Sequence, residues 1–268
     1  MIIDFHTHVF PDKIAKKAIG ALSKNGGIPP HSDGTVFGLV KKATEAGVDI
    51  AVTLPVLTSP EQFESVLGFA KAINEADYGK GARLISFAGI HPRCEDIEGK
   101  MRRIKNEGFL GVKIHPDYQG AYIDDEGYVK ILEGARELDL IVVSHSGEDP
   151  AFLPNIRCTP ERALKLMKRV PGVKLVLAHM GANMMYDEVL CTLAGLDVYF
   201  DTAYVLPLMD EDGFKEILNK HGEDKILFAT DSPWSDIGES LDKLRSFGLG
   251  KEKEEKILYE NAARLLKL

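Results

Sequence analysis

The chain contains 268 residues, of which 44% are apolar and 28% are charged, as is ordinary for a globular protein. This composition excludes a disordered chain, a collagen-like fibre and a small disulfide scaffold. The formal net charge is -8. Because nucleic-acid affinity depends mainly on Lys and Arg that neutralise phosphates, we expect no nucleic-acid partner. No apolar run approaches roughly 18 residues and no secretory signal is visible, so we expect a cytoplasmic protein without a membrane span.

Eight short runs rich in Val, Ile, Leu and Phe recur along the chain, and most of them are continuous rather than alternating. Continuous apolar runs of this length are typical of parallel strands that are buried on both faces. The predicted strands span residues 2–9, 49–56, 84–90, 108–115, 141–145, 174–179, 198–202 and 226–231.

Helical patterns separate these strands. Ser59 followed by Pro60, and Thr159 followed by Pro160, are each typical of an N-cap and the first helical residue after it. Apolar residues spaced three and four apart predict further helices near residues 101–105, 128–138, 187–193, 214–221 and 241–247.

Two further segments have a clear local pattern. The Gly- and Pro-rich segment 25–34 is predicted to be a loop after the first strand. The segment 251–268 is predicted to be an amphipathic helix that docks on the rest of the chain. Its apolar stripe consists of Ile257, Leu258, Leu265 and Leu266.

The alternation of strands and helices predicts an α/β fold with a mainly parallel sheet. Eight strands favour a closed (β/α)8 TIM barrel over an open sheet. A barrel domain routinely reaches about 250 residues, so residues 1–268 are expected to form a single domain.

Six of the eight histidines lie in the last residues of predicted strands. In an α/β barrel these strand ends form one face, and active sites are built there. A solitary histidine at such a place is commonly a core residue, but six that converge on one mouth indicate a functional site. They are His6, His8, His91, His115, His145 and His179.

His6 and His8 share one face of the first strand, because side chains alternate along a strand. Two imidazoles placed in this way can chelate an ion such as zinc, iron, nickel or copper. Asp231 follows the apolar run of the eighth strand, where an unpaired carboxylate would be costly to bury. We expect it to face a metal, a histidine or an arginine, with an N-cap role as the alternative.

Lys113 shares its strand face with His115, so both are expected in the lumen or at its mouth. A buried lysine needs a partner. Three interpretations stay open: an ion pair with Asp231, a neutral amine whose pKa is lowered by burial, or a carboxylated lysine that bridges two metals.

Four residues are candidates for substrate contacts. His91 and Arg93 follow the third strand and His115 follows the fourth, while Trp234 follows the eighth. The alternatives are a surface ion pair for Arg93 and simple packing for His115 and Trp234.

The chain resembles the amidohydrolase superfamily of metal-dependent barrel enzymes. It is most similar to the amidohydrolase-related branch, which contains aminocarboxymuconate-semialdehyde decarboxylase. The resemblance covers nearly the whole chain. It rests on DFHTHVFP at 4–11, GVKIHP at 111–116, HSG at 145–147, LAHMG at 177–181, FDTA at 200–203, LFATDSPW at 227–234 and ENAARLL at 260–266.

The resemblance implies roles for these residues. His6, His8, His145 and Asp231 would hold the primary divalent metal, and Asp231 would also accept a proton from the attacking water. His179 would contact that water or the substrate, or ligate a second metal. Lys113 stands where binuclear members carry a carboxylated lysine, whereas other members are mononuclear, so one or two metals are expected.

Zinc is the first expectation for the metal, with manganese, nickel and iron as alternatives. The resemblance also implies a small-molecule substrate and a homodimer.

Four functions follow, in order of preference. The first is hydrolysis of an amide, lactone or ester in a small metabolite by a metal-activated water. The second is non-oxidative decarboxylation at the same site, which the branch favours and the short chain disfavours. The third is hydrolysis of a phosphoester or of deoxyribonucleic acid. The fourth strand disfavours it, because it carries Lys113 where deoxyribonuclease-like barrels usually have Glu. The last is an inactive metal-binding or scaffolding barrel, which the full ligand set disfavours.

Overall fold

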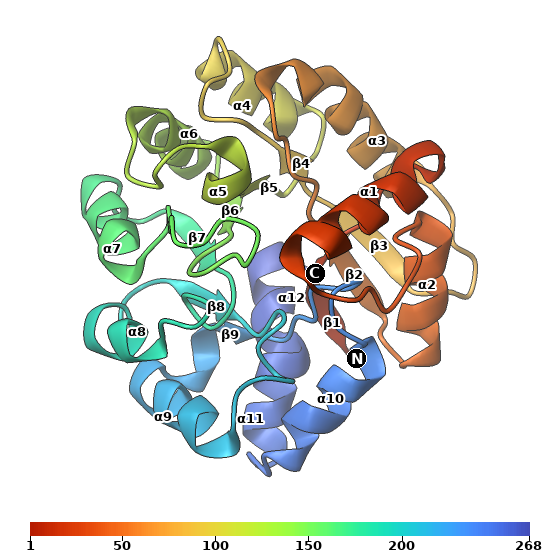
Figure 1. Ribbon diagram of the computed structural model, residues 1–268, viewed down its shortest axis with the longest axis vertical. Helices are drawn as coiled ribbons and strands as arrows, with labels where there is room; N and C mark the ends of the chain where they lie inside the picture. Colours follow the sequence, from red (N-terminus) through yellow and green to blue (C-terminus); the bar gives the residue numbers. More distant parts are fainter.

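The computed structural model describes all 268 residues, and its parallel strands are surrounded by helices (Figure 1). Neighbouring strands pair in parallel in the orders β1-β2-β3 and β4-β5-β6-β7-β8-β9. The strands are β1 (Ile3–Thr7), β2 (Ile50–Thr53), β3 (Arg83–Ser86), β4 (Ala88–Gly89), β5 (Gly111–Ile114), β6 (Ile141–Ser144), β7 (Lys174–Leu177), β8 (Tyr199–Asp201) and β9 (Ile226–Leu227).

The two sheets are parts of one closed barrel. Only Phe87 separates β3 from β4, and its amide donates a hydrogen bond of 3.0 Å to the carbonyl of Thr53, so the pairing with β2 continues through the break. At the other seam the amide of Phe5 donates to the carbonyl of Phe228 over 2.9 Å, which joins β1 to the strand that begins with β9. The predicted eight-stranded TIM barrel is thereby confirmed, and each predicted strand has its counterpart.

Helices alternate with the strands and cover the outside of the barrel (Figure 1). They are α1 (Asp12–Gly26), α2 (Val36–Glu45), α3 (Phe63–Glu75), α4 (Ile97–Asn106), α5 (Pro116–Gln119), α6 (Glu126–Glu137), α7 (Pro160–Arg169), α8 (Tyr186–Thr192), α9 (Glu211–His221), α10 (Ile237–Ser246), α11 (Lys251–Glu255) and α12 (Asn261–Leu266). Short 3-10 turns span Pro60–Gln62 and Glu223–Lys225, and a π-helical turn spans Lys256–Glu260. None of these helices is long and apolar enough to cross a bilayer.

The predicted helix starts are present. The Thr159 side chain accepts a hydrogen bond from the amide of Arg162 at the start of α7, and a 3-10 turn that begins at Pro60 leads into α3. Helix α2 was not predicted from the sequence. Helix α1 extends over Asn25 and Gly26, so the predicted loop 25–34 is two residues too long at its start.

The hydrophobic core has two layers. The larger one, of 57 buried residues, fills the space between strands and outer helices, and it includes Ile257 and Leu258. The smaller one, of 17, contains lumen residues such as Phe5 and Phe87, together with Leu265 and Leu266 of α12. The predicted apolar stripe of the C-terminal segment is therefore buried, and part of it packs against the lumen layer.

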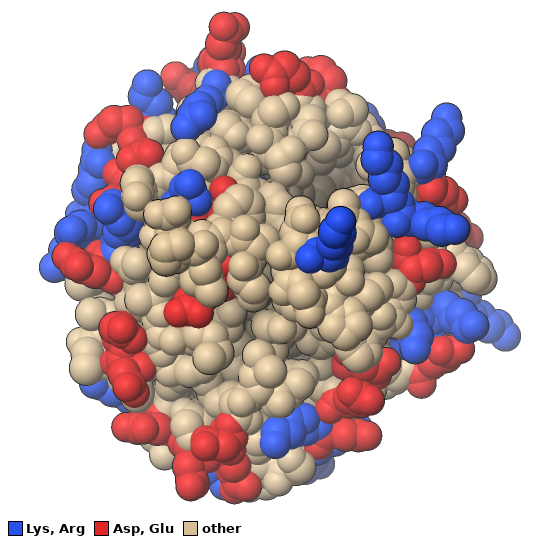
Figure 2. Space-filling view, in the orientation of Figure 1, with Lys and Arg blue, Asp and Glu red and all other residues tan.

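Figure 1 shows α1 in front of the barrel, across the face toward the viewer. Leu22 and Gly26 from this helix, and Ile28 after it, line the cavity at the barrel mouth. In the same orientation, charged side chains gather around the rim of this face and few lie near its centre (Figure 2). The mouth is therefore covered mainly by uncharged groups.

Candidate metal centre

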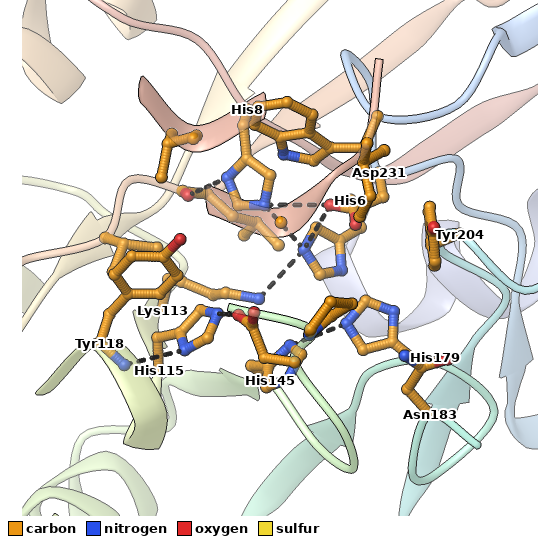
Figure 3. A pocket seen from close by; sticks show the side chains of 18 of the residues that line it. His6, His8, Lys113, His115, Tyr118, His145, His179, Asn183, Tyr204 and Asp231 are labelled. Atoms are coloured by element: carbon orange, nitrogen blue, oxygen red, sulfur yellow. Dashed lines mark hydrogen bonds and ion pairs between the residues drawn. The ribbon is translucent and has the colours of Figure 1, made fainter. Parts of the chain in front are cut away.

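Five of the six predicted strand-end histidines, all except His91, converge with Asp231 on one cavity of about 190 Å³ (Figure 3). They come from β1, from the ends of β5 and β6, and from the segments after β7 and β9. The titratable residues that line the cavity include His6, His8, Lys113, His115, His145, Glu148, Asp149, His179 and Asp231.

A β-bulge turns His6 into the lumen. Phe5 packs in the lumen layer, so strict alternation would turn His6 outward. Between Asp4 and Thr7 the register of β1 against β2 shifts, which inserts one extra residue into β1. Such bulges re-aim side chains and are common near active sites. Both His6 and His8 consequently face the cavity.

Three ligand atoms form a triangle at this end of the cavity. The Nε2 atoms of His6 and His8 are 3.1 Å apart. Asp231 Oδ1 lies 3.1 Å from His8 Nε2 and 3.5 Å from His6 Nε2. All three side chains are largely buried, so the atoms are shielded from bulk water.

The hydrogen bonds behind the triangle orient both imidazoles. His6 Nδ1 donates to Asp201 Oδ2 over 2.8 Å, and His8 Nδ1 donates to the carbonyl of Leu54 over 2.8 Å. Because Nδ1 is the donor in both hydrogen bonds, Nε2 is the nitrogen left in each ring to present a lone pair to the cavity. A carboxylate or carbonyl behind the distal nitrogen is the usual support of a metal-ligating histidine.

The charge states also suit a cation. Burial and the nearby Lys113 lower the pKa of His6 well below its usual value, so this ring is neutral and available as a ligand. Burial raises the pKa of Asp231, but the imidazoles of His6 and His8 outweigh that effect and hold the pKa at about 2. Two imidazole nitrogens and one ionised carboxylate oxygen therefore meet at this end of the cavity.

The separations match the edges of a metal tetrahedron. A zinc ion binds nitrogen or oxygen at about 2.0–2.1 Å, and tetrahedral ligands at that distance are roughly 3.3 Å apart. The measured edges are 3.1, 3.1 and 3.5 Å. The donor set of His6, His8 and Asp231 consequently fits one divalent ion.

Lys113 is buried at the floor of this site. Its Nζ atom lies 3.0 Å from His6 Nε2, whereas the predicted ion pair with Asp231 is not formed. Burial lowers the pKa of Lys113 to about 8, although Asp201 and Asp231 oppose this shift. Lys113 is the only lysine or arginine that lines the cavity.

His145 and His179 form a second pair, next to the triangle rather than part of it. His179 Nδ1 donates to the carbonyl of Ala203 over 2.8 Å, and its Nε2 lies 2.9 Å from His145 Nδ1. The Nε2 atom of His145 is buried without a hydrogen-bond partner, 3.8 Å from Asp117 Oδ2. The structure thus brings together three of the four expected ligands of the primary metal and places His145 beside them.

The backbone is strained at two of these residues. His179 has a φ of 62° and Asp231 a φ of 64°, in the left-handed region that such residues rarely occupy. Strained backbone persists where the surrounding structure enforces it, and it gathers at functional sites. Here it directs both side chains into the mouth of the barrel.

The four residues predicted to contact the substrate fall into two groups. His115 and Trp234 line the cavity. His91 and Arg93 do not: His91 Nδ1 accepts a hydrogen bond from the Arg93 amide, and the exposed Arg93 guanidinium donates to the carbonyl of Gly120. His91 is buried and Arg93 is exposed, and neither lines the cavity.

Sequence reasoning missed two acidic residues of the site. Asp201 is fully buried behind His6, and its Oδ1 accepts hydrogen bonds from the amides of His179 and Ala203. The sequence does contain a signal for Asp201, because this carboxylate follows a short apolar run, as Asp231 does. Asp149 follows β6 and lines the cavity beside His115, and its sequence surroundings carry no comparable signal.

The family model for amidohydrolases matches residues 3–268 of the chain. No curated protein sequence is significantly similar to it. Among solved structures, a 5-carboxyvanillate decarboxylase from Sphingomonas paucimobilis is 14% identical, with a TM-score of 0.71 over 100% of this chain and 99% of that chain.

Two further solved structures have the same fold. A dihydroxybenzoic acid decarboxylase from Polaromonas sp. JS666, solved with manganese and the inhibitor 2-nitroresorcinol, is 18% identical. Its TM-score is 0.73, over 100% of this chain and 97% of that chain. An uncharacterised TIM-barrel protein from Bordetella bronchiseptica is 17% identical, with a TM-score of 0.74 over 99% and 98% of the two chains.

Proposed function

Given that this chain belongs to the amidohydrolase family, we propose that it is a metal-dependent enzyme that removes a carboxylate group from a small molecule as carbon dioxide. The observation that carries the metal dependence is the triangle of His6, His8 and Asp231, whose edges fit one divalent ion. The choice of decarboxylation is supported by the decarboxylases among the solved structures with this fold.

We assign the metal to His6, His8 and Asp231, with His145 as the fourth ligand. The buried position of His145 beside the triangle supports this role, since its Nδ1 lies 2.9 Å from His179 Nε2 and both residues line the cavity. A divalent ion at this position supplies a positive charge that holds a carboxylate and stabilises negative charge as a bond breaks. Zinc remains the first candidate, and the manganese in a structural relative makes manganese the second.

Lys113 is assigned to the substrate carboxylate. Its ammonium is the only cationic side chain of Lys or Arg in the cavity, and burial strengthens its attraction for an anion. In decarboxylation the bond from the substrate carbon to the carboxylate breaks, the electron pair stays on that carbon, and a proton replaces carbon dioxide. Lys113 Nζ faces the same end of the cavity, 3.0 Å from His6 Nε2, and in its protonated form it can supply that proton.

Hydrolysis of an amide, lactone or ester is the second candidate, with Asp231 taking a proton from water. We rank hydrolysis second because the two enzymes with a stated activity among the similar structures described above are decarboxylases.

The test is a paired assay on one preparation. Protein stripped of metal and reloaded with zinc or manganese is offered a panel of ring carboxylates, and carbon dioxide is measured. A panel of amides, lactones and esters is assayed in parallel. We expect carbon dioxide release that requires the metal. Metal-dependent hydrolysis without any carbon dioxide release would overturn the proposal in favour of the second candidate.

A further inference from the structure

Helix α1 crosses the mouth of the barrel without a polar attachment to it (Figure 1). No side chain of α1 forms a hydrogen bond or an ion pair with another element. No backbone hydrogen bond joins residues 12–30 to a segment beyond Pro11 either. By contrast, Asn74 of α3 exchanges two hydrogen bonds with Ser86 of β3. Helix α1 is therefore held in place by apolar contacts alone.

These apolar contacts form a narrow stripe. Ala15 and Ile19 are the only buried residues of α1. Leu22, one turn further, and Ile28, after the helix, are half-buried and line the cavity. The outer face of the helix is exposed and carries its four lysines. Only a few side chains consequently hold α1 against the barrel.

Both ends of the segment that contains α1 are fixed to the barrel. The Phe10 amide donates to the Gly34 carbonyl over 2.8 Å, and the His31 amide donates to the Pro233 carbonyl over 2.7 Å. Just after the helix, exposed Gly27 has a φ of 69°, and a Cβ atom added there would meet no other atom within 4 Å. Glycine in open space can change its backbone angles at little cost. The helix can thus move while the ends of the segment stay in place.

The metal triangle lies in the cavity that α1 covers. Leu22 and Ile28 line this cavity together with His6, His8 and Asp231. The three side chains of the triangle are at most 15% exposed. A ligand that fills the cavity therefore contacts both the triangle and the cover.

The closed position is favoured, but by few contacts. Lifting α1 exposes Ile19, Leu22 and apolar cavity residues such as Leu54 to water, and it breaks no hydrogen bond to the barrel. Segments with few buried apolar contacts open locally at a much smaller free-energy cost than the whole fold. An open position is therefore expected as a minor population.

We propose that α1 is a lid, which detaches from the barrel mouth to admit a ligand and then closes Leu22 and Ile28 over it. Closure of this kind excludes water from the metal centre while the ligand is bound. The inference rests on the cavity and on the contacts of α1, and it does not depend on which reaction the metal centre performs.

Hydrogen exchange followed by mass spectrometry measures the detachment. An isolated helix of 15 residues is only marginally stable in water, so α1 unwinds when it detaches and its amides exchange. We expect the amides of α1 to exchange about 100-fold or more faster than those of α3, which is tied to the barrel by hydrogen bonds.

Three variants of α1 locate the effect. Ile19→Ala removes the main buried contact and is expected to speed the exchange of α1 by about 10-fold or more. Ile14→Ala is the matched control, because it makes the same truncation on the same helix at a side chain that is 49% exposed, and the exchange should stay within about threefold. Gly20→Ala, at an exposed position with free space, favours the helix and should slow the exchange about fivefold.

The access of a reagent to the cavity measures the gate itself. Diethylpyrocarbonate modifies imidazole nitrogens, and peptide mapping gives its rate at each histidine of the purified protein. His115 lines the cavity, whereas His31 is exposed and serves as the internal reference. We expect Ile19→Ala to speed the modification of His115 about 10-fold and to leave that of His31 unchanged. Leu22→Ala is the second variant in case Ile19→Ala does not fold.

The outcomes separate the lid from the proposed reaction. Exchange of α1 that is as slow as that of α3 shows a fixed cover and overturns the lid. Equal rates of His115 modification in Ile14→Ala and Ile19→Ala also overturn it, because the helix then moves without controlling access. Faster exchange and faster modification in Ile19→Ala alone support the lid, whether or not carbon dioxide release is found.

Discussion

The buried carboxylate of Asp201 holds His6 by a hydrogen bond of 2.8 Å from His6 Nδ1, across 195 positions of sequence. The other carboxylate oxygen of Asp201 accepts from two backbone amides, so its orientation is fixed. This arrangement leaves the Nε2 lone pair of His6 as the only one that can face a metal.

Asp201→Asn is expected to weaken metal binding by about 10- to 100-fold, as is usual when the support of a metal-ligating histidine is changed. In the variant, an NH₂ group replaces one of the two carboxylate oxygens of residue 201. This NH₂ group faces either His6 Nδ1 or the two backbone amides, and because all of these are donors, at least one hydrogen bond is lost. The measurement is a metal dissociation constant from chelator competition. Asp197→Asn, which changes an exposed carboxylate just before β8, is the control. Equal affinities in both variants would contradict the role of Asp201.

His145→Ala is expected to lower both the metal content per chain and the turnover, because His145 is the proposed fourth ligand. Metal content is measured by plasma mass spectrometry on protein purified without chelators. His221→Ala is the matched control: His221 is also a buried imidazole, but it binds the Gly195 amide and the Val198 carbonyl away from the cavity. Full metal occupancy with normal turnover in His145→Ala would refute the assignment.

Much of the fold could be predicted because its signals are local. Each buried parallel strand is a continuous apolar run, and the start of α7 carries its own cap in Thr159 and Pro160. The strand-end positions of His6, His8 and Asp231 then follow from barrel geometry, since all strands of a barrel end at one face. These three residues do converge in the structure.

Other parts of the site depend on contacts that no local pattern contains. The bulge in β1 that turns His6 inward is a register shift between two strands. The pairing of His115 with Asp149 depends on the course of the loop after β6. Arg93 follows a strand, as substrate-binding residues of barrels do. Its guanidinium, however, donates a hydrogen bond to the backbone carbonyl of Gly120.

Lys113 predicts a pH dependence of stability in the metal-free protein. Its pKa is about 8 in the folded chain and 10.5 in the unfolded chain, so between these values the unfolded chain binds more protons. The free energy of unfolding therefore rises with pH across this window, by about 3 kcal/mol from Lys113 alone. Urea denaturation at a series of pH values, compared between the unsubstituted protein and Lys113→Met, isolates this contribution. The variant should lack that part of the rise, and identical pH profiles would contradict the burial of a charged lysine.

The loop that follows His145 depends on a glycine at position 147. Gly147 has a φ of 85°, and a Cβ atom placed there would lie 2.1 Å from the backbone nitrogen of Asn183. This close approach pairs the loop with the segment after β7, since the Glu148 amide donates to the Asn183 carbonyl over 3.0 Å. The loop begins directly after His145 and carries Glu148 and Asp149, so its path sets part of the cavity wall.

Gly147→Ala is consequently expected to destabilise the protein and to reduce turnover together. Gly172→Ala is the control for backbone strain, because Gly172 has a φ of 80° but a Cβ atom added there would meet no other atom within 4 Å. The strain alone costs about 1–2 kcal/mol, which is the loss expected at Gly172 with unchanged activity. Gly147→Ala should lose more than this in urea denaturation, because the backbone of Asn183 must also move. Equal losses at both positions would show that the close approach to Asn183 does not constrain the loop.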